Sequence, residues 1–120
     1  MSQRVTGVVR GHTPVVTLHC PGLSDAVDFV VDTGYTGWLS LPQAAAPRWP
    51  LVRRGFGRAN LADGSTVVVE VCTTTVEWLG ETRAVYVEVL PSGEPLLGFR
   101  MLVGTRLTLH EIAVEIERLA

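Results

Sequence analysis

The sequence predicts an all-β fold, and two observations lead to that prediction. Valine and threonine, which favour strands, are abundant, and turn-forming residues recur about every eight to twelve positions. Apolar residues also alternate with polar ones, as they do in a strand with one buried face. The alternation is clearest at Val85, Val87 and Val89, and it recurs at Val67, Val69 and Val71, with Glu70 and Cys72 on the opposite face.

The expected strands are apolar or alternating runs that are bounded by turn-forming residues. In the first half of the chain they span Val5–Arg10, Val15–Cys20, Ala26–Asp32 and Trp38–Leu41. In the second half they span Gly57–Leu61, Thr66–Trp78, Arg83–Leu90 and Arg106–Glu111.

Two reversals are expected between these strands. Asp63 and Gly64 form a pair that favours a type I′ turn, and Leu79–Glu81 reverses the chain a second time. The segment Ala44–Arg54 interrupts the strand pattern. Its three alanines, two prolines and three arginines predict a short helical turn followed by an irregular loop.

The C-terminal part predicts one short helix and leaves the tail open. Phe99–Val103 contains no helix breaker, which predicts one or two helical turns. In the tail, the alternation of Ile112, Val114 and Ile116 predicts a strand. However, Ile112, Ile116 and Leu119 would also line one face of a helix, so both conformations stay open.

Length and composition limit the classes of protein to consider. The chain has 120 residues, enough for one domain, which we take to span residues 1–120. Its net charge of −2 and its scattered arginines give no basic surface for nucleic acid or anionic lipid. Neither a signal-peptide pattern nor an apolar run of membrane-spanning length is present. We therefore expect a soluble, cytoplasmic protein in which Cys20 and Cys72 are buried free thiols rather than a disulfide.

One tripeptide carries the strongest chemical signal. The Asp-Thr-Gly of Asp32–Gly34 directly follows the mostly apolar run Val27–Val31, so a strand delivers a carboxylate and a small hydroxyl into a glycine turn. Leu96–Gly98 gives a second apolar–glycine element ahead of the expected helix, and Ala62–Ser65 forms the tip of a long hairpin. Asp-Thr-Gly alone is an ordinary turn composition. Its coincidence with the other two elements makes it informative.

This order of elements resembles one lobe of an aspartic protease, and most closely the single-lobe, retropepsin-like family in its small bacterial members. The resemblance covers about Thr6–Glu111. It implies a closed β-barrel with one short C-terminal helix, which pairs with a second copy about a two-fold axis. It also implies a catalytic loop of Asp32, Thr33 and Gly34, a substrate-binding flap of Ala62, Asp63, Gly64 and Ser65, and structural support of the loop from Leu96, Leu97 and Gly98.

Peptide hydrolysis by this route needs one group that deprotonates water and another that protonates the carbonyl oxygen. Two neighbouring carboxylates can do both, because like charges at short distance do not both ionise and the pair shares a proton. The chain has one Asp-Thr-Gly, so the resemblance implies a homodimer in which two symmetry-related Asp32 carboxylates activate the water. Thr33 would link the two loops across the axis. The implied function is a homodimeric aspartic endopeptidase acting on a peptide or protein substrate, with apolar residues flanking the cut.

Two positions depart from the retroviral pattern. Tyr35–Gly37 stand where retroviral enzymes have an alanine and two acidic residues, and Phe99 stands where they have an arginine. Tyr35 and Trp38 are candidates for a substrate-binding subsite, although aromatic residues beside a strand more often belong to a core or an interface.

No metal and no cofactor is expected. His12, His19 and His110 lack the close spacing of metal ligands, and the sequence has no serine elbow, phosphate loop or dinucleotide fingerprint. Two alternatives to the enzyme stay open. One is a non-catalytic dimeric peptide-binding or regulatory module on the same fold, and the other is a lobe that pairs with a different partner chain.

Overall fold

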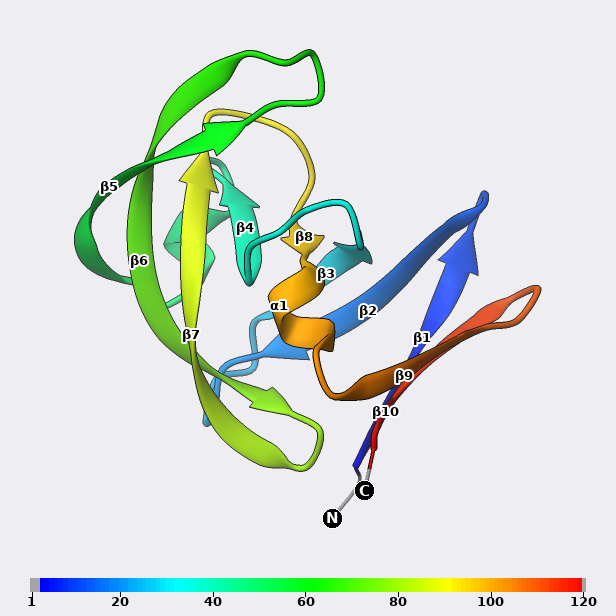
Figure 1. The fold of residues 1–120 in the computed structure, drawn as a ribbon. Coiled ribbons are helices and arrows are strands. Elements are labelled where there is room, and N and C mark those ends of the chain that lie inside the picture. The colour runs from blue at the N-terminus through cyan, green and yellow to red at the C-terminus, as the bar shows by residue number, and fades with distance from the viewer. Residues whose placement is uncertain (1–2, 120) are drawn as a thin grey trace.

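The computed structural model describes residues 3–119, and its regular secondary structure is almost entirely strand (Figure 1). Residues 1, 2 and 120 of the expected domain lie outside the described part. Besides the strands there are a 3-10 turn, η1 (Ala46–Arg48), and a one-turn helix, α1 (Phe99–Leu102). The strands are β1 (Arg4–Arg10), β2 (Thr13–His19), β3 (Ala26–Val31), β4 (Leu39–Pro42), β5 (Val52–Asn60), β6 (Thr66–Trp78), β7 (Glu81–Leu90), β8 (Leu96–Leu97), β9 (Thr105–Leu109) and β10 (Ala113–Arg118).

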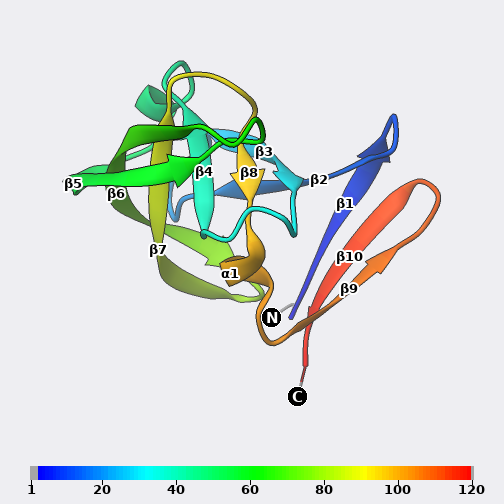
Figure 2. The same ribbon diagram turned by 45° about the horizontal axis from the view of Figure 1, so that its top comes forward.

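All strands belong to one sheet, in the order β5-β6-β7-β4-β8-β3-β2-β1-β10-β9. The sheet is strongly bent, but its end strands β5 and β9 do not pair with each other, so the expectation of a closed barrel is wrong (Figures 1 and 2). The β9–β10 hairpin continues the sheet from β1 and points away from β5, β6 and β7 (Figure 2). Alternation identifies the buried face of a strand. It does not tell whether the first and last strands of a sheet meet.

The core gathers side chains from both halves of the chain. β7 confirms the predicted alternation, because Val85, Val87 and Val89 are buried whereas Tyr86 is exposed. Burial of one large apolar side chain contributes about 1.5–3 kcal/mol to stability, so such positions hold the strands firmly in place. The largest fully buried side chains include Trp78, Phe29, Leu18, Leu39, Leu41, Leu97 and Met101.

Strand β6 does not keep one buried face along its whole length. Val69 is buried as predicted, but Cys72 is also buried, although the alternation placed it on the opposite face. The change coincides with an irregularity in β5 between Arg53 and Gly55, where the register of the β5–β6 pair shifts. Cys20 and Cys72 are both buried and free, as expected.

One segment differs from its expected structure, and another settles a choice that the sequence left open. β5 begins at Val52, so the arginines expected in a loop lie in a strand, where Arg53 pairs with Glu70 at 2.6 Å. The tail that the sequence left open forms strand β10, which pairs with β1 and β9. The reversal at Leu79–Glu81 and the short helix are both confirmed. Within residues 3–119, no helix has the length and apolar character needed to cross a membrane.

Candidate active site

The loop between β3 and β4 carries the predicted catalytic tripeptide. β3 runs parallel to β8, with Val31 opposite Leu97, and the Asp32 amide donates a hydrogen bond to the Leu97 carbonyl at 2.9 Å. Leu97 is completely buried. Asp32 therefore stands at the end of a strand that is fixed in the middle of the sheet, beside the second apolar–glycine element.

The Asp32 carboxylate is partly exposed and is oriented by its own loop. Its Oδ1 accepts a hydrogen bond from the Gly34 amide at 2.9 Å. A Cβ atom at position 34 would lie 3.3 Å from the same oxygen, so glycine leaves this contact unobstructed. Thr33, between them, is exposed. The loop thus presents one carboxylate and one hydroxyl at the surface.

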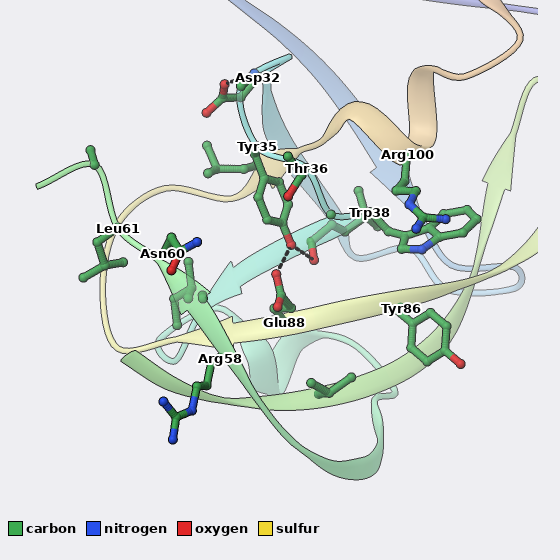
Figure 3. Close-up of a pocket in the computed structure, with 18 residues that line it drawn as sticks. Asp32, Tyr35, Thr36, Trp38, Arg58, Asn60, Leu61, Tyr86, Glu88 and Arg100 are labelled. Carbon is green, nitrogen blue, oxygen red and sulfur yellow. Dashed lines mark hydrogen bonds between the residues drawn. The ribbon is translucent and has the colours of Figure 1, made fainter. Parts of the chain in front are cut away.

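Tyr35 connects this loop to β7. Its hydroxyl donates to the Glu88 carboxylate and lies 3.2 Å from the carbonyl oxygen of Leu39 (Figure 3). Its main-chain carbonyl accepts a hydrogen bond from the Phe99 amide at 2.7 Å. Burial, followed by the bond to Glu88, raises the pKa of Tyr35 far above its usual value. The hydroxyl therefore stays protonated and keeps its role as a donor.

Two glycines make room for the Tyr35 ring. A Cβ atom on Gly98 would lie 2.3 Å from the carbonyl oxygen of Gly37 and 2.6 Å from Cδ2 of Tyr35. A Cβ atom on Gly37 would lie 2.4 Å from the Tyr35 hydroxyl oxygen. All three distances are shorter than real contacts, so any larger residue would force the loop apart. The Leu-Leu-Gly pattern pointed to Gly98. No pattern in the sequence indicated that position 37 must also be a glycine.

The loop borders a cavity of about 940 Å³. Such a volume lies within the range of ligand-binding clefts and can hold several side chains. Among the residues predicted from the sequence, Asp32, Gly34, Tyr35, Trp38, Ala62 and Leu96 line this cavity, whereas Thr33, Asp63, Gly64, Ser65, Leu97 and Gly98 do not.

The hairpin tip between β5 and β6 has a different turn from the one predicted. A type I′ turn needs positive φ at both central residues, but of Asp63 and Gly64 only Gly64 has it, at 87°. The Gly64 amide donates to the Leu61 carbonyl at 2.9 Å, and the Leu61 amide donates to the Ser65 carbonyl at 2.8 Å. The Asp63 carboxylate accepts from the amide and the hydroxyl of Ser65, at 2.8 and 2.5 Å. These bonds favour a three-residue loop that ends at a left-handed glycine.

Several residues around the cavity had no signal in the sequence. Arg58 and Asn60 come from β5, Tyr86 and Glu88 from β7, and Arg100 from α1 (Figure 3). They reach the cavity through the pairing and bending of strands that are far apart in the sequence, which alternation alone does not specify. Within the described part of the chain, no three His, Cys, Asp or Glu side chains are grouped so that they could hold a metal ion.

The architecture matches a protease of known structure. A retropepsin-like aspartic protease from Rickettsia conorii superposes with a TM-score of 0.63 at 16% sequence identity, over 98% of this chain and 91% of that chain. No protein-family model and no curated protein matches the sequence. At this identity the likeness establishes the fold and not the activity. The chain therefore has the retropepsin-like fold that its Asp-Thr-Gly, hairpin and Leu-Leu-Gly elements indicated.

Proposed function

We propose that this chain is an aspartic-type endopeptidase that hydrolyses peptide bonds as a two-fold homodimer. The observation that carries the proposal is the position of Asp32. A strand-anchored loop of a retropepsin-like fold presents its carboxylate at the edge of a cavity large enough for a peptide. The Oδ1 contact with the Gly34 amide holds the group in one orientation.

The chemistry requires a second carboxylate, and the chain supplies one Asp-Thr-Gly. A second copy, related by a two-fold axis, would place its own Asp32 beside the first. The two groups would share a proton, so that the ionised one deprotonates a water molecule while the protonated one donates to the peptide carbonyl oxygen. The exposure of Thr33 next to Asp32 supports such a contact, because its hydroxyl is free to face a partner.

The β5–β6 hairpin would cover the bound peptide. Leu61 and Ala62 at its tip line the same cavity as Asp32, which supports this role for the hairpin. Tyr35 and Trp38 line the cavity from the loop itself, where they would contact the residues that flank the cut bond. Asp63, Gly64 and Ser65 would act indirectly, by fixing the shape of the tip.

The test is the substitution Asp32→Asn. The amide has nearly the same shape as the carboxylate but does not act as a general base, so cleavage of unstructured peptides should fall by at least about a hundred-fold. Asp25→Asn is the matched control, because Asp25 is exposed and lies outside the cavity. Equal cleavage rates for Asp32→Asn and the wild type would contradict the proposal. Binding of extended peptides without cleavage by any form would instead favour a peptide-binding module.

A further inference from the structure

Two arginines, Arg58 and Arg100, line the candidate cavity. Neither Arg58 nor Arg100 forms an ion pair within residues 3–119, although both line the cavity. Most other arginines are neutralised by carboxylates. Those that pair with an aspartate or glutamate are Arg4, Arg10, Arg48, Arg53, Arg106 and Arg118.

The acidic groups of the cavity balance these two charges in number, but within residues 3–119 neither of them forms an ion pair with Arg58 or Arg100. Asp32 and Glu88 are the acidic residues among those that line it. The Glu88 carboxylate already accepts the Tyr35 hydroxyl, and Asp32 accepts the Gly34 amide. Arg58 and Arg100 therefore keep unused donors beside the space that a ligand would fill, in a chain whose net charge is −2.

The two arginines stand at different places around the cavity. Arg58 belongs to β5 and Arg100 to α1, and their guanidinium groups lie well apart, on either side of the Tyr35–Glu88 pair (Figure 3). One compact anion would therefore not contact both. An extended peptide with separate acidic side chains fits this spacing better, because a guanidinium binds a carboxylate through two parallel hydrogen bonds.

We propose that the cavity selects peptides that carry aspartate or glutamate near the segment facing Asp32, with Arg58 and Arg100 as the residues that determine this preference. The inference rests on the proposed function in treating the cavity as a peptide site. In such a peptide, apolar residues would still stand directly beside the cut bond. The acidic residues would flank this apolar segment, away from the Asp32 carboxylate.

The experiment measures binding separately from cleavage. Asp32→Asn protein is titrated with fluorescent extended peptides that have an apolar centre and an acidic residue on each side, and with the same peptides carrying asparagine or glutamine instead. Each carboxylate should strengthen binding by roughly two- to five-fold, because exposed ion pairs contribute little individually. At about 1 M salt the difference should largely disappear, since the Debye length falls to about 3 Å.

Substitutions of single arginines test which residues cause the preference for acidic peptides. Arg58→Gln and Arg100→Gln should each lower the ratio of the affinity for the acidic peptide to the affinity for the neutral peptide. Arg54→Gln is the matched control, because Arg54 is an exposed arginine of the same strand β5 that bonds to Thr73 and does not line the cavity. Arg54→Gln should keep the full preference.

The outcomes separate this inference from the proposed function. Equal affinity for acidic and neutral peptides, binding of neither, or an equal loss in Arg54→Gln would overturn the acidic preference. If wild-type protein cleaves the neutral peptide as fast as the acidic one, the endopeptidase stands and the preference does not. If the acidic peptide binds selectively but wild-type protein cleaves no peptide, the preference stands and the endopeptidase does not.

Discussion

At the scale of single residues, the position of Asp32 depends on partners that are distant in the sequence. The Leu97 carbonyl holds its main chain, and the Tyr35 hydroxyl anchors the rest of the loop to Glu88. Gly98 gives the Tyr35 ring the space it occupies. A carboxylate held in this way needs little rearrangement before it can act, which is the usual condition for efficient general base catalysis.

Tyr35→Phe tests the importance of this anchor. Loss of the hydroxyl leaves the Glu88 carboxylate without its donor in a part-buried site, so the free energy of unfolding should fall by about 1–2 kcal/mol. Denaturant unfolding monitored by circular dichroism measures the change. Tyr86→Phe is the control, because Tyr86 lines the same cavity but is 52% exposed. Its effect should stay within about 0.5 kcal/mol.

A double-mutant cycle identifies the partner. If the Tyr35 hydroxyl acts through Glu88, Tyr35→Phe should cost much less stability in a Glu88→Ala background, which has no side-chain acceptor, than in the wild type. The same cost in both backgrounds would show that the stabilisation comes from another contact, such as the one to the Leu39 carbonyl.

At the scale of elements, the β5–β6 hairpin is the part whose local chemistry matters most to the proposed function. Its tip is closed by the Asp63 carboxylate, which accepts from both the hydroxyl and the amide of Ser65. The hydroxyl bond first, and the amide bond second, lower the pKa of Asp63. A lowered pKa in the folded state means that the ionised group stabilises the turn above its unfolded pKa. This stabilisation is lost as the pH falls through the folded pKa.

Ser65→Ala should therefore move the Asp63 titration upward, toward the ordinary value for aspartate of about 3.9. NMR titration of the side-chain carboxyl carbon measures this directly, and Asp28, whose pKa is lowered mainly by the hydrogen bond from Thr17, serves as the control that should not move. In the wild type, the Ser65 amide resonance should shift in the same acid range as Asp63 becomes protonated. Identical Asp63 titrations in Ser65→Ala and wild type would contradict the assigned cause.

The same hairpin shows where sequence reasoning succeeded and where it stopped. The glycine turn and the two flanking strands were predictable from composition. The turn type was not predictable. Asp63 lacks the positive φ that a type I′ turn requires, and its side chain instead accepts a hydrogen bond from Ser65. Arg58 and Glu88 were also missed as cavity residues. Their positions depend on how β5 and β7 bend around the loop that carries Asp32, and a single strand's pattern carries no information on that bend.

At the scale of the whole molecule, the sheet is open and the chain provides one Asp-Thr-Gly loop. The expectation of a closed barrel failed because the β9–β10 hairpin extends outward from β1 and does not return to β5 (Figure 1). The overall fold was nevertheless predictable from three short motifs in the right order. The motifs fix local backbone geometry, whereas closure depends on how twist accumulates over all ten strands.

Mixing wild-type and Asp32→Asn subunits tests most directly the claim that two chains share one site. In an equal mixture with random pairing, about half of the wild-type chains would lie in mixed dimers that hold only one carboxylate. The account predicts that peptide-cleaving activity per wild-type chain falls to about half, and falls further as the variant is added in excess. The same mixture with Asp25→Asn should lose no activity. Activity per wild-type chain that stays constant at every ratio of Asp32→Asn would contradict the shared site.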